Sequence, residues 1–533
     1  MSDEEKEPRN PGRGTRLGLG ALSGLLAGFA ALAVAELVAA GVRPQAGPVV
    51  AVGGAAIDRT PAAVKDWAIR NFGTDDMLIL QLGILIVSGL LALALGVLGL
   101  RHRRIAAAGI LGFGAIGAVA ATSRPDSAAL TDALPSIMGA LVAALLLYAL
   151  VGRLLAPRRQ QARSPEPAGE SWDRRGFVIA ATTAAAATAG AGALGRALNG
   201  AGGRDALASR KSVNLPVPSS RAPVVPRRAQ VRVAGVSPFI TPNEDFYRVD
   251  TALVVPTVDT TAWRLRIHDQ GVRRPLTLSF DELLRRELIE RDITLTCVSN
   301  EVGGPYVGNA RWIGVRLADL LAECGVRPPS QGGPADQLVA RSVDGMTIGS
   351  PVEDVMDGRD ALLAVGMNGE PLPFGHGFPV RMVVPGLYGY VSACKWIEDI
   401  ELTTFDAYDA YWVRRDWARE APIKTQSRID TPKPFARPRS GTVMVAGVAW
   451  AQHRGIDKVE VRVDDGPWQE ATLAAEDSRD TWRQWSYPWR ATKGGHTVTV
   501  RATDRTGQVQ TEKRSRTIPD GAGGWHSVVV TVE

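Results

Sequence analysis

The stretch that decides the fold is DITLTCVSNEVGGPYVGN, residues 292–309. It begins as an apolar, β-branched run typical of a buried strand and passes at Cys297 into a loop rich in Gly, Ser and Asn. A strand end that delivers a thiol into such a loop suits a metal ligand or a nucleophile, because a thiolate is a soft ligand. A buried structural cysteine is the alternative that these residues leave open. Cys324 and Cys394 keep that structural interpretation.

A second cluster of polar residues lies downstream, in GHGFPVRMVVPGLYGYVSACKW, residues 375–396. Its glycines allow the backbone to approach a ligand closely. His376, Arg381 and Lys395 supply hydrogen-bond donors that suit a phosphate or a polar heterocycle. Taken alone, this pattern predicts an anion-binding site without naming the anion.

Mixed strands and helices surround both stretches. Short Val- and Ile-rich strands alternate with short helices over residues 229–428, which predicts an α+β domain. Residues 429–533 carry short, alternating strands separated by Gly- and Asp-bearing turns, which predicts an immunoglobulin-like β-sandwich. A segment rich in Pro, Ser and Arg, residues 201–228, precedes the α+β domain and is expected to be an extended linker.

The N-terminal part, residues 1–200, is predicted to be a membrane domain with about five transmembrane helices. Four apolar runs are each near the ~20 residues that a helix needs to cross the hydrocarbon core. They cover residues 17–42, 77–100, 105–122 and 134–155. The fifth segment begins with Arg174-Arg175 and resembles a twin-arginine export signal placed inside the chain. An ordinary fifth helix with a basic flank is the alternative.

Arginines cluster in the loop after residue 100 and again after residue 155. The positive-inside rule then places these loops and the N-terminus in the cytoplasm, and the domains after residue 200 outside the cytoplasmic membrane. The net charge of +6 is interpreted as part of this topology, so no nucleic-acid partner is expected. None of the three cysteines lies in a CxxC pair and no HExxH spacing appears, which argues against zinc-ribbon, thioredoxin-like and classical zinc enzymes.

The chain resembles the sulfite oxidase family of molybdenum enzymes over most of its second half. Five blocks carry the resemblance, in the family's order: TPNEDFYRVDTALVVP at 241–256, CVSN followed by ARWIGVRLADLL at 297–321, GMNGEPLPFGHGFPVRMVVPGLYGYVSACKWI at 366–397, AGVAWAQHRGIDKVEVRVDDGPWQEATL at 446–473, and GGWHSVVVTV at 523–532. The resemblance implies a sulfite-oxidase-type molybdopterin domain followed by a C-terminal dimerisation domain.

The resemblance also implies a molybdenum–molybdopterin cofactor, with Cys297 as the protein ligand to the metal and as the catalytic residue. His376 and Arg381 would contact the pterin phosphate or its neighbouring polar edge, and Lys395 would lie against the pterin. Asn300 matches the family's Asn three residues after the ligand. Tyr247 lies in the segment leading into the domain, whose polar residues reach the metal in the family.

Several pocket positions depart from the family pattern. Sulfite oxidases carry an arginine in the leading segment and further arginines after the cysteine motif, and these bind an oxyanion beside the metal. Here Glu301 follows the cysteine motif, and Asp250 aligns with the leading arginine unless the alignment shifts to Arg248. Trp417 aligns with the family's late pocket tyrosine. The sequence therefore predicts that the cofactor site is kept and the sulfite site is largely lost.

These features predict a membrane-anchored bacterial oxidoreductase that performs two-electron redox or oxygen-atom transfer on a small substrate, and that is not a true sulfite oxidase. A sulfoxide or N-oxide reductase of the same family is one alternative, and a non-catalytic surface sandwich protein is the other. A separate electron-transfer partner is expected, because His102 is the sole histidine near the apolar runs and a haem commonly needs His ligands within helices. A homodimer through the C-terminal domain is expected from the resemblance.

Overall fold

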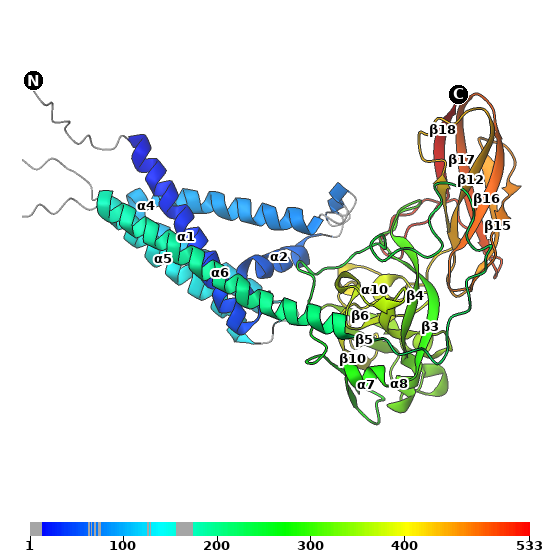
Figure 1. Ribbon diagram of the computed structural model, residues 1–533, viewed down its shortest axis with the longest axis horizontal. Helices are drawn as coiled ribbons and strands as arrows, with labels where there is room; N and C mark the ends of the chain where they lie inside the picture. Colours follow the sequence, from blue (N-terminus) through cyan, green and yellow to red (C-terminus); the bar gives the residue numbers. More distant parts are fainter. Residues whose placement is uncertain are drawn as a thin grey trace, which may run out of the picture. The chain divides into compact units, whose positions relative to one another are not determined.

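The structure, a computed structural model, describes residues 13–61, 64, 67–68, 71–72, 76–124, 127, 129–155 and 174–533. The chain divides into two compact units (Figure 1). The first unit comprises Met1–Arg204 with Thr251–Val254, and the second comprises Asp205–Asp250 with Val255–Glu533.

The first unit is helical. Its elements are α1 (Arg13–Val42), η1 (Pro44–Ala46), α2 (Pro48–Arg59), α4 (Asp76–Thr122), η3 (Leu130–Ala133), α5 (Leu134–Leu155) and the greater part of α6 (Arg174–Ser212). Within the described residues, four helices are long and apolar enough to cross a membrane. The sequence predicted about five such segments, and the difference arises in α4.

Helix α4 joins two apolar runs that the sequence kept separate. His102 has non-helical backbone angles, φ −137° and ψ 65°, so the element is kinked there. A Cβ built on Gly109 would lie 2.8 Å from the Leu95 side chain. In a straight helix these two positions would be about 21 Å apart, since each residue rises 1.5 Å. The two halves of α4 therefore run back beside each other, and the predicted break between residues 100 and 105 lies at His102.

Small residues allow α1 and α4 to pack closely. A Cβ added to Gly24 would lie 1.9 Å from the Ala92 carbonyl oxygen, and one added to Gly96 would lie 2.2 Å from the Gly20 carbonyl oxygen. No side chain fits at such distances. In a lipid bilayer, no hydrophobic force drives helices together. Helices there commonly associate through close backbone contacts between small residues.

The predicted linker, residues 201–228, is partly wrong. Residues 201–212 continue helix α6, which ends at Ser212 with Arg210 and Lys211 in its last turn. Extended chain follows and runs beside the start of strand β3 (Leu288–Thr296): the Ser219 amide donates to the Leu288 carbonyl at 2.9 Å, and the Glu290 amide donates to the Ser220 carbonyl at 2.8 Å. The helical continuation was missed because glycine is a poor helix former and two glycines, at positions 202 and 203, stand at the start of this stretch.

The predicted α+β region contains two five-stranded sheets. The first has the order β2-β1-β10-β5-β6, with β1 parallel to β10 and the other pairs antiparallel. Its strands are β1 (Arg264–Asp269), β2 (Leu276–Ser279), β5 (Gln337–Ser342), β6 (Thr347–Pro351) and β10 (Ile397–Thr403). The second has the order β3-β4-β7-β8, with β9 pairing to β7. Its remaining strands are β4 (Val307–Arg316), β7 (Leu362–Met367), β8 (Glu370–Pro371) and β9 (Arg381–Val383).

Short helices connect these strands, as the sequence predicted. They are α7 (Phe280–Leu284), α8 (Leu317–Glu323), α9 (Val352–Met356) and α10 (Gly389–Ser392). Helix α7 begins with a capping box, in which the Ser279 side chain accepts from the Glu282 amide and the Glu282 carboxylate accepts from the Ser279 amide. Phe280 and Leu283 of this helix are buried in the core that also covers β1 and β10.

The C-terminal region is a pair of four-stranded sheets around one apolar core (orange and red in Figure 1). One sheet contains β11 (Gln426–Thr431), β12 (Gly441–Trp450), β16 (Arg483–Ala491) and β15 (Thr472–Leu473). The other contains β14 (Gln469–Glu470), β13 (Ile456–Val463), β17 (Gly494–Asp504) and β18 (His526–Val532). The sandwich begins with β11 at Gln426, three residues before the predicted boundary at residue 429.

Candidate active site

Strand β3 ends directly before Cys297, as the sequence predicted. The Cys297 side chain is buried, with 8% of the residue exposed, and none of the three cysteines forms a disulfide. Its amide donates to the Tyr306 carbonyl at 2.9 Å, and its carbonyl accepts from the Asn300 amide at 3.0 Å. Both backbone groups of Cys297 are thereby fixed, so the thiol has a defined position at the strand end.

The loop after Cys297 is shaped by Asn300. Its Oδ1 accepts from the Tyr306 amide at 2.8 Å, which ties the loop across its own base. Gly304 is required for this arrangement, because a Cβ there would lie 2.7 Å from Asn300 Oδ1. Glu301 is exposed on the same loop. The predicted cofactor contact of Asn300 stays a prediction, since the observed hydrogen bond gives this side chain a role in loop shape.

Arg381 is a buried cation at the start of β9, with 6% of the residue exposed. Its Nη1 donates to the His376 carbonyl at 3.1 Å, and its guanidinium lies over the Trp312 ring at 5.0 Å. Within the described part of the chain, its Nε has no hydrogen-bond partner. Burial lowers the pKa of this guanidinium to about 10, which still leaves it charged near neutral pH. A buried cation with an unpaired N–H fits an anionic ligand group.

His376 lies beside Arg381 in the turn η5 (Phe374–His376). Its Nε2 is 2.9 Å from the Asn243 carbonyl, so this nitrogen carries the proton and donates. Burial, followed by the charge of Arg381, lowers the pKa of His376 to about 4. The imidazole is therefore neutral near pH 7, and its other ring nitrogen is an acceptor. Gly377 next to it has φ +109° and would place a Cβ 3.0–3.1 Å from Arg381 and Lys395.

Lys395 forms an ion pair with Asp250. Its Nζ donates to Asp250 Oδ2 at 2.7 Å, and both side chains are about one-tenth exposed. Arg248, which is more exposed, lies with its Nε 3.8 Å from the same carboxylate oxygen. Burial lowers the pKa of Lys395, and the Asp250 carboxylate opposes this shift. Asp250 therefore compensates two neighbouring cations, and the predicted alignment of the family's leading arginine with Asp250 or with Arg248 stays a prediction.

Tyr247 connects the thiol with the cation cluster. Its ring stacks on Phe246, with 5.2 Å between centroids, and meets Tyr306 edge-on at 6.3 Å. Burial, followed by the neighbouring Cys297, raises the pKa of the Tyr247 hydroxyl, whereas Arg381 lowers it. The hydroxyl therefore lies within electrostatic reach of both Cys297 and Arg381, and it keeps its proton at neutral pH. The structure brings together two clusters that are far apart in sequence.

Trp417 is buried in an aromatic cluster. Its ring contacts Tyr390 at 5.2 Å and Trp412 at 5.4 Å between centroids. In the described residues, its indole Nε1 has no hydrogen-bond partner. Trp417 therefore packs within an aromatic cluster, and its predicted place in the substrate pocket stays a prediction.

Tyr388, Lys424 and Asp520 form a further polar contact that the sequence did not single out. Lys424 donates to Asp520 at 2.9 Å and to the Gly521 carbonyl at 2.7 Å, and the Tyr388 hydroxyl is 3.5 Å from the Lys424 amide. Gly521 has φ +95°, and a Cβ there would lie 2.5 Å from the Tyr388 hydroxyl oxygen. Tyr388 stands in the glycine-rich run and had a sequence signal. Lys424 and Asp520 had none, because their pairing depends on a loop of the sandwich.

The family described as "Oxidoreductase molybdopterin binding domain" matches residues 252–412. The mitochondrial sulfite oxidase of Rattus norvegicus is 32% identical over 288 residues, which cover 46% of this chain and 52% of that protein. The NADH nitrate reductase 1 of Oryza sativa subsp. japonica is 33% identical over 201 residues, which cover 33% of this chain and 21% of that protein.

The chain spans about half the length of the mammalian sulfite oxidases it matches. Among solved structures, the sulfane dehydrogenase SoxCD from Paracoccus pantotrophus aligns with a TM-score of 0.48 at 25% sequence identity. That alignment covers 56% of this chain and 84% of the SoxCD chain.

Proposed function

This chain carries a molybdopterin-binding oxidoreductase domain of the sulfite oxidase family, and from that premise we propose that its second unit performs two-electron redox with oxygen-atom transfer on a small substrate. The predicted family, enzyme class and molybdenum–molybdopterin cofactor are confirmed by the match. The alternative of a non-catalytic surface protein has no support in it. The observation that carries the proposal is the buried Cys297 thiol, linked through Tyr247 to a buried arginine with an unpaired N–H.

The residues present fit this cofactor. Cys297 offers a soft thiolate ligand for the metal. Arg381, with its unpaired Nε–H, suits the phosphate, because this group can donate to a phosphate oxygen. Neutral His376 already donates from Nε2 to the Asn243 carbonyl, so its other ring nitrogen suits an N–H group on the polar edge of the pterin. Lys395 is assigned to the pterin edge as well, and Gly377 lets the backbone pass close to Arg381 and Lys395, because a Cβ there would lie 3.0–3.1 Å from both. Tyr247 and Asn300 complete the proposed binding set.

The chain's own residues position and orient the reactants. Bound at this site, the cofactor would supply two-electron redox and oxygen-atom-transfer chemistry. Cys297 would hold the metal, and its backbone is fixed because both its amide and its carbonyl are hydrogen-bonded. Tyr247 retains its hydroxyl proton at neutral pH and can donate it in a hydrogen bond to a polar substrate oxygen. Electrons then pass singly to or from a separate protein partner.

The ion pairing in the site favours a neutral substrate, such as a sulfoxide or an N-oxide, because Asp250 already engages Lys395 and Arg248. Asp250 already neutralises Lys395, and Glu301 adds a further carboxylate on the thiol loop. Trp417 and Arg248 are the remaining pocket residues assigned by alignment. An anionic substrate such as sulfite would meet carboxylates where the family provides guanidinium groups. Both an oxidase and a reductase are compatible with this arrangement, and assays in each direction with dye donors and acceptors distinguish them.

We also propose that the first unit anchors the enzyme in the cytoplasmic membrane as a multi-pass domain, with the second unit on the extracytoplasmic side. Four long apolar helices, one of them folded back at His102, support this arrangement. Arg174-Arg175 at the start of α6 would act as a twin-arginine signal. Reporter fusions at about residue 210 and at the C-terminus test the topology. A cytoplasmic signal from either fusion would contradict it, and substituting both arginines by lysine should trap the second unit inside.

The C-terminal sandwich is proposed to be immunoglobulin-like and to pair two copies of the chain. Two four-stranded sheets around one core support the first part of this proposal. Sedimentation of the detergent-solubilised protein tests the second part. A mass of one chain at micromolar concentration would contradict the dimer.

The central experiment measures molybdenum and pterin in the purified protein. We expect about one of each per chain when a cofactor-competent host makes the protein, and Cys297→Ser should abolish activity. Cys324→Ser is the matched control, because Cys324 is also buried but lies at the end of helix α8, outside the site. Wild-type protein without molybdenum would refute the proposed function.

A further inference from the structure

We propose that the C-terminal sandwich positions the catalytic cysteine, and that Gln452 is the residue through which it does so. The inference rests on the proposed function, because it takes Cys297 as the metal ligand. Gln452 lies just beyond strand β12 and is fully buried, with 0% of the residue exposed. It contacts strand β3 from the side opposite to β4.

Strand β3 is the edge strand of its sheet, so one edge needs partners outside the sheet. The sandwich supplies them at Thr294. The Thr294 amide donates to the Asp480 carbonyl at 2.9 Å, and the Trp482 amide donates to the Thr294 hydroxyl at 2.7 Å. The Thr294 carbonyl accepts from Gln452 Nε2 at 2.9 Å. Both backbone groups and the side chain of Thr294 are thus held by the C-terminal domain.

Gln452 uses a single amide nitrogen for two bonds to β3. Besides the Thr294 carbonyl, Nε2 donates to the Thr296 hydroxyl at 3.0 Å. Its Oε1 is buried and has no hydrogen-bond partner among the described residues. A buried amide with an unpaired oxygen is costly. The Gln452 amide nitrogen is the group that contacts strand β3. Without it, the Thr294 carbonyl and the Thr296 hydroxyl would each lose a hydrogen-bond partner.

These contacts act one and three residues before Cys297. From the β4 side, the Cys297 amide is fixed by the Tyr306 carbonyl. From the sandwich side, Thr294 and Thr296 are fixed by Gln452. The end of strand β3 is therefore hydrogen-bonded on both sides, by the α+β region and by the sandwich, and the position of the Cys297 thiol depends on both. Residues that do not bind the metal but orient a residue that does commonly tune a metal site.

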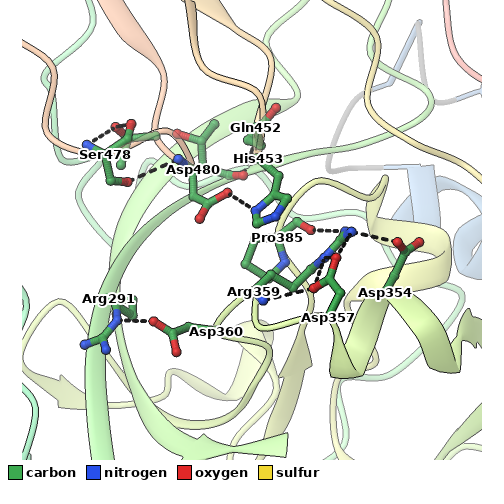
Figure 2. Close-up of polar contacts among 12 residues, drawn as sticks. Arg291, Asp354, Asp357, Arg359, Asp360, Pro385, Gln452, His453, Ser478 and Asp480 are labelled. Carbon is green, nitrogen blue, oxygen red and sulfur yellow. Dashed lines mark hydrogen bonds and ion pairs between the residues drawn. The ribbon is translucent and has the colours of Figure 1, made fainter. Parts of the chain in front are cut away.

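The loop that carries Gln452 is itself held in place (Figure 2). His453 follows Gln452, and its Nδ1 lies 3.2 Å from Asp480 Oδ1, so the two segments that grip Thr294 are joined to each other. Below them in the view, Arg359 bonds the carboxylates of Asp354 and Asp357 and the Pro385 carbonyl, which fixes the neighbouring loop of the α+β region. Gln452 thus sits in a framework with little freedom to adjust.

The test replaces Gln452 by Leu in the full chain. Gln484→Leu is the matched control, because Gln484 is equally buried and also bridges the two domains, through the Ser237 carbonyl and the Val231 amide, without touching β3. We expect both variants to lower the melting temperature. Only Gln452→Leu should raise, several-fold, the rate at which iodoacetamide alkylates Cys297 in cofactor-free protein, counted by mass spectrometry against Cys324. Only this variant should also shift the molybdenum(V) electron paramagnetic resonance signal of the loaded enzyme.

Equal alkylation rates and unchanged resonance signals in the two variants would overturn the proposal. If Gln452→Leu does not accumulate, Gln452→Glu is measured instead, since it keeps the side-chain volume and replaces the donating amide by an accepting carboxylate. Absence of molybdenum from the wild-type protein would refute the proposed function. The alkylation comparison needs no cofactor, so it would still decide whether Gln452 positions Cys297.

Discussion

Asp250→Asn is the substitution that most directly tests how the pocket selects its substrate. In the wild-type protein the Asp250 carboxylate accepts from Lys395 Nζ at 2.7 Å and lies 3.8 Å from Arg248 Nε. Removing this charge frees two cations at the position where the family places an arginine. The variant should therefore bind an anionic substrate better than the wild-type protein does.

The expected size follows from the hydrogen bond that is transferred. A charge-assisted hydrogen bond is worth about 1.5–3 kcal/mol net. Moving it from Asp250 to sulfite should raise kcat/KM for sulfite by roughly 10- to 150-fold. Loss of the Asp250 carboxylate also removes the group that raises the pKa of Lys395, so this pKa falls further below its ordinary value. The gain should therefore shrink as pH rises, because less of Lys395 is then charged.

The assay is steady-state turnover of sulfite with an artificial one-electron acceptor. Asp245→Asn is the control, because Asp245 stands in the same leading segment but is exposed. Stability should fall by about 3 kcal/mol in Asp250→Asn, since a buried cation loses its partner. An unchanged or lower kcat/KM for sulfite in a fully loaded, folded Asp250→Asn protein would refute the reasoning that Asp250 excludes anions.

Three further outcomes are expected. Arg381→Gln should weaken cofactor retention by roughly 10- to 150-fold, because a charge-assisted bond is lost, and molybdenum content after dialysis measures it; full retention would contradict the phosphate assignment. Burial, followed by the Asp292 carboxylate, raises the pKa of Asp477 to about 6. The folded state therefore holds a proton that the unfolded state releases, so the free energy of unfolding falls as pH rises from about 4 through 6. Asp477→Asn should remove that fall in melting temperature, and a persistent slope would refute it. Gly96→Val should disrupt the contact between α1 and α4 and lower the melting temperature in detergent. An unchanged melting temperature would contradict the inference that this close contact stabilises the helical unit.

Features that depend on local pattern could be predicted from the amino-acid sequence alone. Apolar runs indicated helices long and apolar enough to cross a membrane, and period-two strands with turns indicated the sandwich, because both signals are carried by neighbouring residues. The strand-end position of Cys297 was likewise readable, since one strand and one loop define it. The resemblance added the cofactor, and the family match confirmed it.

Contacts between residues far apart in the sequence became visible once the chain was folded. The tertiary structure extended α6 to Ser212 and turned Asn300 toward its own loop. It also paired Asp250 with Lys395, 145 residues away, and brought Gln452 to Thr294, 158 residues away. Such contacts leave no local signal, because a buried polar group takes whatever partner the packing of whole domains places within hydrogen-bond distance. Charge balance and thiol position at this site are therefore properties of the assembled fold.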